Sequence, residues 1–309
     1  MFDIINQKNN KHWWYLSPAL IILVIFTFFP LTKTFIISLS RDYNKFNDHF
    51  TATFNFENYR NVFKDPEFLI SLRNTLILVF FTVPISLFIS LIIALTLNSI
   101  QNRFFKDFLK TFFFLPLLSN IVIMGMVFSI IFYYNYEMEN YPQGVFNSFL
   151  SSVFHIKPQQ WITNTAPYEH KMFVLIIYNI WTRLPFKIFV FVLALQDINK
   201  SYYEAAKIDG ASRFRIFFKI TLPLLIPIIF YQFIIEMLAI FKEYESIIGI
   251  FANNINYEIR TIVGYIYAQT SNFSYNSYSK GATAAMILFF ISVLFTVLSF
   301  YFSKKKINY

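Results

Sequence analysis

Apolar residues gather into long runs along this chain, and polar segments separate them. Each run has about 20 residues or more, roughly what an α-helix needs to cross a ~30 Å hydrocarbon layer. Backbone polar groups in lipid must be satisfied within the segment, so such runs are expected to be helical. The pattern predicts six membrane-spanning helices, at Tyr15–Leu39, Leu72–Asn98, Phe108–Tyr134, Lys171–Gln196, Ile220–Phe241 and Ala282–Ser303.

Proline interrupts several of these runs, which suggests kinked helices that line a path. The prolines are Pro30, Pro84, Pro116, Pro185, Pro223 and Pro227. The first run is too long for the apolar part of a signal peptide, and five more follow it. We therefore expect it to be retained as a span.

Composition supports a membrane protein and excludes some chemistry. Of the 309 residues 56% are hydrophobic and 14% are charged, and the mean hydropathy is +0.50, which a soluble domain of this length does not show. With no cysteine, disulfides, thiolate metal sites and cysteine nucleophiles are excluded. We predict an all-α membrane protein with one transmembrane domain over residues 1–309.

The net charge of +9 is better explained by basic cytoplasmic loops than by nucleic-acid binding. With both termini in the cytoplasm, the short inner segments hold thirteen basic residues: Lys8, Lys11, Arg103, Lys106, Lys110, Lys200, Lys207, Arg213, Arg215, Lys219 and Lys304–Lys306. The outer loops are about twice as long but hold only seven: Arg41, Lys45, Arg60, Lys64, Lys157, Arg260 and Lys280. Both termini are therefore expected to be cytoplasmic.

The longest predicted cytoplasmic loop, residues 197–219, is expected to form two short helices around a glycine. Glu204-Ala205-Ala206 favours a helix, and Gly210 supplies a permissive backbone for the turn. Residues 213–219 are expected to form a basic amphipathic helix, and Leu222-Pro223 marks the entry into the fifth span. Such a protruding elbow can insert into a groove on a partner protein.

This loop resembles the "EAA" coupling loop of ABC importer permeases, in which Glu-Ala-Ala is followed at fixed spacing by Gly, Ile and Leu-Pro. The seven positions of that pattern are filled by Glu204, Ala205, Ala206, Gly210, Ile220, Leu222 and Pro223. The remainder of the chain is similar to the sugar-type permeases, above all to the first permease of the glycerol-3-phosphate importer and its maltose and polyol relatives. The segments that carry this similarity are residues 56–59, 63–66, 74–75, 114–116, 195–196 and 278–282. One departure is Ile198-Asn199, where the family usually has Ile-Pro, and it suggests a less stiff entry into the loop.

The resemblance implies a permease subunit of an ATP-driven, binding-protein-dependent importer for a sugar, polyol or glycerol-3-phosphate in a bacterial inner membrane. Its implied partners are a second homologous permease, two ATPase subunits, an extracellular solute-binding protein and membrane lipid, with no nucleic acid. In such importers the loop docks in a cleft of the ATPase. By that analogy Glu204 is the polar anchor, Gly210 the turn, and residues 213–219, including Arg213, the docking flank.

The chain itself is not expected to be an enzyme or to hold a cofactor. None of its six glycines is followed by lysine, so a phosphate-binding Gly-Lys loop is excluded, and ATP and Mg²⁺ are assigned to the partner ATPase. The four histidines, His12, His49, His155 and His170, lie scattered in tails and outer loops, so no metal site is predicted.

Polar residues inside the predicted spans are candidates for the solute pathway, because they are costly in lipid. Asn179, Arg183 and Lys187 recur every four residues on one face of the fourth span, and Gln232 and Glu236 lie one turn apart in the fifth. Arg183 and Lys187 could bind an anionic group of the solute. Alternatively, Arg183 and Glu236 form a packing ion pair and Lys187 extends its stem to the interface.

Three other interpretations are weaker. Tyr178 and Trp181 could stack on a sugar ring, although 21% of the residues are aromatic. An ion-coupled secondary transporter or channel would have no use for the Glu-Ala-Ala loop. A membrane enzyme would need acid–base or metal-ligating residues at the membrane surface, and the pattern offers none.

Overall fold

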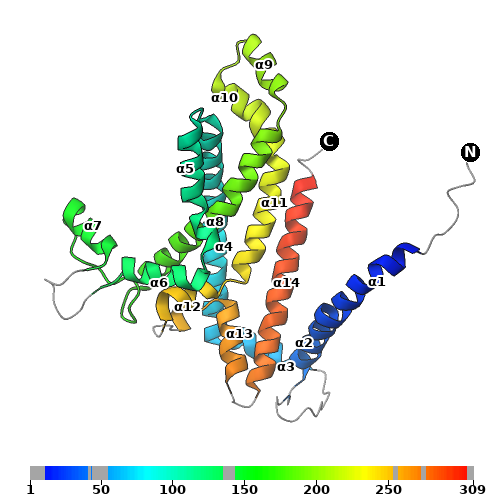
Figure 1. The fold of residues 1–309 in the computed structure, drawn as a ribbon. Coiled ribbons are helices and arrows are strands. Elements are labelled where there is room, and N and C mark those ends of the chain that lie inside the picture. The colour runs from blue at the N-terminus through cyan, green and yellow to red at the C-terminus, as the bar shows by residue number, and fades with distance from the viewer. Residues whose placement is uncertain are drawn as a thin grey trace, which may run out of the picture. The chain divides into compact units, whose positions relative to one another are not determined.

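The computed structural model describes residues 11–40, 43, 55–134, 143–252, 257–272 and 276–304. Every regular element in these ranges is helical, so the all-α prediction is confirmed (Figure 1). Chain contacts define two compact units. Unit 1 comprises residues 1–65 and 266–289, and unit 2 comprises residues 66–265 and 290–309. The single transmembrane domain over residues 1–309 stays a prediction.

Five continuous helices among the described residues are long and apolar enough to cross a membrane. They are Trp13–Leu39, Pro66–Ser99, Tyr168–Asp197, Arg213–Phe241 and Ser277–Ser303. Each overlaps one of the predicted spans. A sixth crossing exists only if Arg103–Leu118 and Ile121–Ile131 together form one span, because the two helices are bent by 106° at the break between them.

The third predicted span is therefore not one helix, and local chemistry explains the break. Helix α5 (Arg103–Phe114) passes into the short 3₁₀ helix η2 (Leu115–Leu118), which contains Pro116. Proline donates no N–H to a continuing helix. The side chain of Asn120 then accepts the N–H of Val122 at 2.8 Å and begins helix α6 (Ile121–Ile131) in a new direction.

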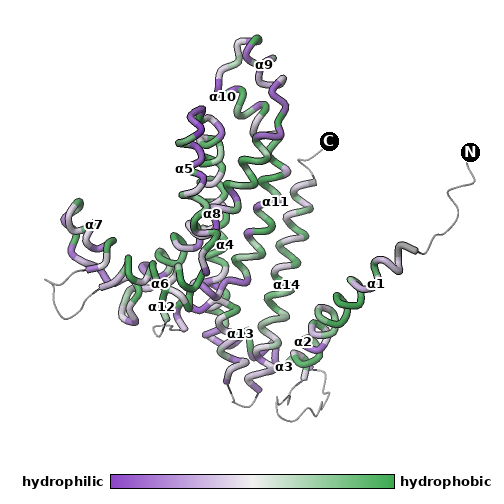
Figure 2. Tube along the Cα trace, in the orientation of Figure 1, coloured by the Kyte–Doolittle hydropathy of each residue, from purple (hydrophilic) through white to green (hydrophobic). Residues whose placement is uncertain are grey.

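Three long helices form the core of unit 2. These are α4 (Pro66–Ser99), α8 (Tyr168–Asp197) and α11 (Leu222–Phe241), and each packs against the other two. Figure 2 shows α11 as largely hydrophobic. The buried face of α4 includes small polar residues, namely Ser71, Thr75, Thr82, Ser86 and Ser90. Small side chains let helix backbones approach closely in a membrane protein.

The short helices α6 and α12 (Glu245–Phe251) cross with their backbones in contact. A Cβ atom added to Gly125 would lie 2.7 Å from the Cα of Gly249, and one added to Gly249 would lie 2.7 Å from the carbonyl oxygen of Val122. No L-amino acid with a side chain fits at either position without a shift of backbone. The two glycines therefore make this crossing possible.

At the α4 N-terminus, Asn74 and Thr75 bind the segment around η5 (Tyr257–Ile259). The Asn74 amide donates to the carbonyls of Glu258 and Arg260 at 2.7 and 2.9 Å, and the hydroxyl of Thr75 accepts the N–H of Ile262 at 3.0 Å. Ion pairs of Lys171 with Glu258 and of Arg260 with Glu67 reinforce this end of the unit. Asn74 and Thr75, which are part of the sequence resemblance, thus hold the segment around η5 against α4 by hydrogen bonds.

Unit 1 contains α1 (Lys11–Leu23), the π-helix η1 (Val24–Phe28), α2 (Phe29–Leu39) and α3 (Glu57–Lys64). It also contains parts of α13 (Ile262–Ser271) and α14 (Ser277–Lys304). The Asn58 amide of α3 donates to the carbonyls of Ser38 and Ser40 at 3.0 and 2.9 Å, and Thr283 of α14 donates to Ser38 at 3.2 Å. These bonds join α3 and α14 to the end of α2. Helix α7 (Val145–Phe154) belongs to unit 2 and lies between α6 and α8 in the sequence. There the side-chain oxygen of Asn147 accepts the indole N–H of Trp161 at 3.0 Å.

Candidate functional site

The first candidate site is a protruding helix–turn–helix between α8 and α11. We call residues 199–216 the elbow; it contains α9 (Lys200–Ile208) and α10 (Arg213–Ile216) (Figure 1). The side chain of Asn199 accepts the N–H of Ser201 at 3.0 Å, so Asn199 is the N-cap of α9. The departure from the family's usual proline at this position therefore replaces one helix-starting residue by another.

Gly210 makes the turn that separates α9 from α10. Its φ is +69°, in the left-handed region that favours glycine. The N–H of Ala211 donates to the carbonyl of Ala206 at 2.9 Å and that of Gly210 to the carbonyl of Lys207 at 3.0 Å. These two bonds form a Schellman motif, which satisfies the last carbonyls of α9.

The second part of the elbow continues directly into the fifth long helix. Ser212 accepts the N–H of Arg215 at 3.3 Å and begins α10, which continues through the π-helix η3 (Phe217–Thr221) into α11. A separate basic helix over residues 213–219, with a span that begins at Ile220, is not observed. Residues 213–241 form one helix instead, in which Ile220 lies in η3 and Leu222-Pro223 begin α11.

The elbow exposes both charged and apolar side chains. Glu204, Ala205, Gly210 and Arg213 are exposed, whereas Ala206 is buried. Ile208 and Phe214 are 87% and 77% exposed, although apolar residues are usually found covered. No described residue forms an ion pair with any charged residue of the elbow. The elbow therefore presents a mixed surface of charged and apolar side chains that the described residues leave largely exposed.

The second candidate site lies in the helical core, where the predicted polar face of α8 meets α11. Asn179 is 1% exposed and donates to the hydroxyl of Ser246 at 3.2 Å, while its carbonyl oxygen accepts from Arg183 Nε at 3.3 Å. Lys187 is also 1% exposed, and its ammonium donates to the carbonyl of Arg183 at 3.1 Å. The three predicted residues thus form one connected row, buried at Asn179 and Lys187 and partly exposed at Arg183.

Each cation of this row has a carboxylate partner, but the partners differ from the predicted pair. Lys187 Nζ lies 2.9 Å from Glu236 Oε2, and Arg183 pairs with Glu243. The predicted Arg183–Glu236 pair is therefore not observed, and Lys187 does not extend to the interface. The two helices run in opposite directions, because α8 ends at the elbow and α11 begins there. Of the two cations Lys187 is therefore nearer the elbow, and of the two carboxylates Glu236 is nearer, so these two form a pair.

Glu243 is the functional candidate that the sequence analysis missed, because it was assigned to an outer loop. Its carboxylate pairs with Arg183 and also accepts the N–H of Ser246 at 2.9 Å, near the start of α12. Seven residues separate Glu236 from Glu243, two helical turns. Glu243 could be found in the sequence by continuing the helix face of Gln232 and Glu236 for two more turns.

Three polar atoms in the same helical core have no hydrogen-bond partner among the described residues. They are the hydroxyl of Thr82, the amide nitrogen of Gln232 and one carboxylate oxygen of Glu236, and all three residues are buried. Buried polar atoms normally find a partner, so these belong to the parts of the core that can hydrogen-bond another molecule.

The aromatic candidates of α8 serve packing. Tyr178 is fully buried, its hydroxyl donates to the carbonyl of Ile121, and its ring lies 5.0 Å from that of Phe128 in an edge-to-face arrangement. Trp181 packs on the same Phe128 ring at 5.4 Å. Tyr178 is thus already committed to the α6–α8 contact and presents no free face to a sugar.

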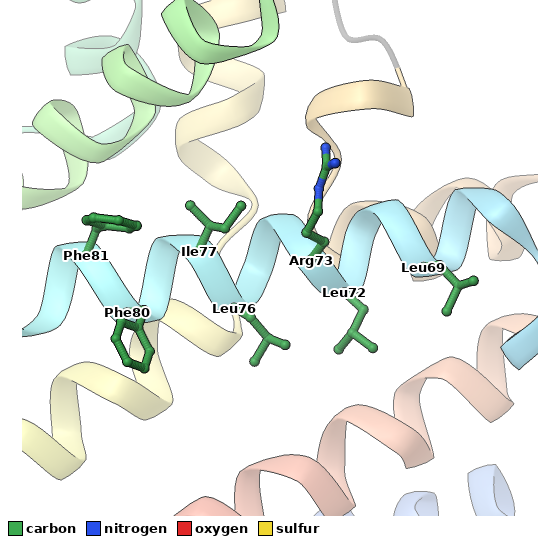
Figure 3. A pocket seen from close by; sticks show the side chains of 7 residues that line it. All are labelled: Leu69, Leu72, Arg73, Leu76, Ile77, Phe80 and Phe81. Atoms are coloured by element: carbon green, nitrogen blue, oxygen red, sulfur yellow. The ribbon is translucent and has the colours of Figure 1, made fainter.

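A large surface cavity elsewhere in unit 2 lacks the features of a solute site. It measures about 500 Å³ and is lined by seven residues of α4, from Leu69 to Phe81 (Figure 3). Six of the seven are apolar, and Figure 3 shows Leu69, Leu72, Leu76 and Phe80 on one side of the helix and Arg73 on the other. The Arg73 guanidinium lies over the ring of Tyr168, 4.6 Å from its centroid. Such an apolar helix face is what a membrane protein presents to lipid or to another subunit.

In the described ranges no three metal-ligating side chains cluster, and the absence of a metal site stays a prediction.

Comparison with known proteins shows which family this chain is similar to. Residues 86–307 match the family described as "Binding-protein-dependent transport system inner membrane component". The chain is 29% identical to the arabinooligosaccharides transport system permease protein AraP of Bacillus subtilis, over 96% of this chain and 90% of that protein. It is also 29% identical to the lactose permease protein LacF of Rhizobium radiobacter (95% and 94% covered), and 26% identical to the sn-glycerol-3-phosphate permease protein UgpA of Pectobacterium atrosepticum (94% and 93% covered).

A solved structure shares the fold. A chain of a bacterial ABC transporter involved in import of the acidic polysaccharide alginate superimposes with a TM-score of 0.79 at 21% identity, covering 97% of this chain and 99% of that one. The family match spans most of the chain, and in this family ATP hydrolysis belongs to a separate subunit. The chain therefore belongs to the inner membrane components of binding-protein-dependent transport systems, and is a multi-pass permease subunit of an ABC importer without an ATPase of its own.

Proposed function

We propose that this permease carries a neutral sugar or short oligosaccharide, and that its elbow couples transport to a separate ATPase. The observation that carries the substrate proposal is the pairing of both cations of the α8 row, Lys187 with Glu236 and Arg183 with Glu243. The two pairs sum to no net charge, so the polar face of α8 has no uncompensated cation to offer a phosphate. A site for an anion normally keeps at least one cation free to bind it.

Unpartnered hydrogen-bonding atoms support a polyhydroxyl solute. The Gln232 amide can donate, one oxygen of Glu236 can accept, and the Thr82 hydroxyl can do either. Sugar hydroxyls are both donors and acceptors, so they match such a mixed set without adding charge. AraP and LacF, two of the relatives named above, are permeases of neutral sugars by their names, whereas UgpA is named for a phosphate ester.

The elbow supports coupling to an ATPase through its exposed surface. Glu204, Arg213, Ile208 and Phe214 combine charge and apolar area on a rigid frame fixed by the cap at Asn199 and the turn at Gly210. A surface of this composition is typical of a docking site for a protein. We propose that a homologous second permease, two ATPase subunits and an extracellular solute-binding protein complete the importer.

We further propose that the elbow and both termini face the cytoplasm of a bacterial cell. The basic residues Arg103, Lys106 and Lys110 at the start of α5 and those of the elbow then lie on one side, as the positive-inside rule requires. Lys8, Lys305 and Lys306 of the tails lie outside the described residues. Because the chain contains no cysteine, Ser201→Cys and Ser148→Cys can be labelled singly in intact cells with a membrane-impermeant maleimide. We expect labelling at position 148 only, and labelling of position 201 alone would reverse the orientation.

The decisive test of the substrate is uptake by the reconstituted importer with its binding protein and ATPase. We expect ATP-dependent uptake of lactose or an arabinooligosaccharide, and no uptake of glycerol 3-phosphate above background. The double variant Arg183→Gln with Glu243→Gln removes one ion pair without leaving a lone charge, so it should retain most uptake of the neutral sugar. Arg103→Gln, an exposed change at the start of α5, is the matched control.

Two results would overturn the proposal. Uptake of glycerol 3-phosphate that collapses when Arg183 is replaced would show an anion site. Uptake that persists when the ATPase is omitted or inhibited by vanadate would show an ion-coupled transporter.

A further inference from the structure

A second cavity, of about 340 Å³, lies entirely within unit 1, between α2, α13 and the start of α14. Its lining is mixed. The polar lining residues are Lys33, Thr34, Tyr43, Thr270 and Tyr278, and the others are Pro30, Ile37, Ile266, Gly281, Ala282 and Ala285. Neither the family match nor the proposed solute pathway assigns any role to this cavity.

The cavity is built by specific contacts. Gly281 lets α13 and α14 approach, because a Cβ atom there would lie 2.9 Å from Cγ2 of Thr270. The rings of Tyr43 and Tyr278 lie 5.6 Å apart and close one end, while Thr283 hydrogen-bonds Ser38 at the end of α2. The small residues Ala282 and Ala285 leave the space open on the α14 side.

Lys33 is the one charged side chain between residues 15 and 39 of the first apolar helix. It is exposed, and no described residue forms a hydrogen bond or ion pair with its ammonium group. Neighbouring side chains on the same helix are apolar and exposed, including Phe29 at 67% and Phe35 at 40%. An unpaired charge in lipid is costly, and the described residues provide no anion for this cation.

The position of Lys33 along the helix indicates where that anion lies. Six residues separate Lys33 from Leu39, the last residue of α2, which corresponds to about 9 Å along the axis. The long stem of a lysine can carry its ammonium part of that distance toward the polar boundary of the membrane. Tyr43 and Tyr278 at the same end are residues typical of the membrane interface.

We propose that this cavity binds an anionic phospholipid, with Lys33 paired to the headgroup phosphate and the apolar wall of Pro30, Ile37 and Ile266 against an acyl chain. The hydroxyls of Thr34 and Thr270 donate to carbonyls of their own helices, to Pro30 at 2.8 Å and Ile266 at 3.0 Å. Lys33 is the one charged residue of the lining, so its charge favours a headgroup with net negative charge over a zwitterionic one. The mixed lining favours a lipid over a free anion, which has no use for the apolar wall.

The test uses the assembled importer in vesicles of phosphatidylcholine with phosphatidylglycerol as the minor lipid, followed by extraction and native mass spectrometry. We expect phosphatidylglycerol to remain bound to wild type and to Lys33→Arg. Lys33→Gln should retain about tenfold less, since it loses a charge-assisted hydrogen bond. Lys64→Gln, an exposed lysine at the end of α3, should behave as wild type.

Ala285→Phe tests the cavity without touching the charge, because a ring at position 285 fills the space while Lys33 remains. It should also reduce the retained phosphatidylglycerol. Equal retention in wild type, Lys33→Gln and Ala285→Phe overturns the proposal. Displacement of the lipid by inorganic phosphate assigns the cavity to a soluble anion instead, and loss of the second permease in Lys33→Gln with lipid retention unchanged assigns Lys33 to the subunit interface.

Discussion

The core of unit 2 and the elbow both contain charged side chains of either sign, but in opposite environments. In the core, Lys187 and Arg183 are each paired with a carboxylate, and the row they form is largely removed from water. In the elbow, Glu204 and Arg213 are exposed and have no partner among the described residues. The same residue types are thus paired within the fold in one region and exposed without a described partner in the other.

The two regions also use glycine differently. In the core, Gly125 and Gly249 are required by the closeness of two backbones, and neither has a positive φ. In the elbow, Gly210 has open space around it, because no other atom lies within 4 Å of the place a Cβ atom would take, but its φ is +69°. In the core, glycine is needed because there is no space for a side chain. In the elbow, glycine is needed because of the backbone conformation of the turn.

The largest effect is expected from breaking a buried ion pair. Lys187→Met leaves Glu236 charged and uncompensated, which should lower the free energy of unfolding by about 3–5 kcal/mol. The double variant Lys187→Met with Glu236→Leu removes both charges and should recover most of that loss. Thermal unfolding of the detergent-purified permease measures both, and equal losses in the single and double variants would show that the pair is not coupled.

The next largest effect is expected at the glycine crossing of α6 and α12. Gly125→Ala places a methyl group against backbone atoms of Gly249, which cannot rotate away, and should cost about 1–3 kcal/mol of stability. Gly264→Ala is the matched control, because its Cβ atom would meet only side-chain atoms, the nearest of them in Tyr244 at 3.4 Å. If both substitutions lower the unfolding temperature equally, the crossing is not as tight as the structure shows.

A change of charge at the elbow should affect transport and leave stability unchanged. Glu204→Lys should reduce ATP-dependent uptake about tenfold, equivalent to about 1.4 kcal/mol, because the exposed carboxylate is the proposed anchor for the ATPase. The control is Asp107→Lys, the same change at an exposed position of α5. An altered unfolding temperature in Glu204→Lys, or normal uptake, would contradict the assignment.

The smallest effect is expected at the turn of the elbow. Gly210→Ala introduces no clash but forces a residue with a side chain into the left-handed region, at a cost of roughly 1 kcal/mol. Gly210→Asn should cost less, because asparagine tolerates that conformation. Unfolding temperatures of the two variants measure the difference, and a larger loss for asparagine than for alanine would rule out backbone strain as the cause.

Periodicity predicted much of the core, but pairing required the fold. The row of Asn179, Arg183 and Lys187 follows directly from the four-residue spacing in the sequence. The partner of Arg183 does not, because it depends on the antiparallel register of α8 and α11 and on Glu243, which hydropathy assigns to a loop. Mean hydropathy also does not single out Lys33, because one lysine scarcely lowers the mean hydropathy of a long apolar run.

The break in the third predicted span illustrates the same limit. Residues 108–134 are apolar throughout their centre, and hydropathy does not record direction. Pro116 and Asn120 were visible in the sequence, but proline alone also occurs within the continuous helices α4 and α8, as Pro84 and Pro185. The combination of proline with an N-capping asparagine four residues later distinguishes the break from a kink.

The continuity of α10, η3 and α11 has a mechanical consequence. Residues 213–241 form one rod of 29 residues, roughly 43 Å long, with the elbow at one end and Glu236 near the other. If the elbow couples to an ATPase as proposed, a displacement of Arg213 would be carried along this helix toward the ion pair of Glu236 with Lys187. The five-residue π-helix η3 is the most compliant stretch of that lever, because its hydrogen bonds depart from the regular spacing. Bending within η3 would therefore reduce the displacement that reaches the core.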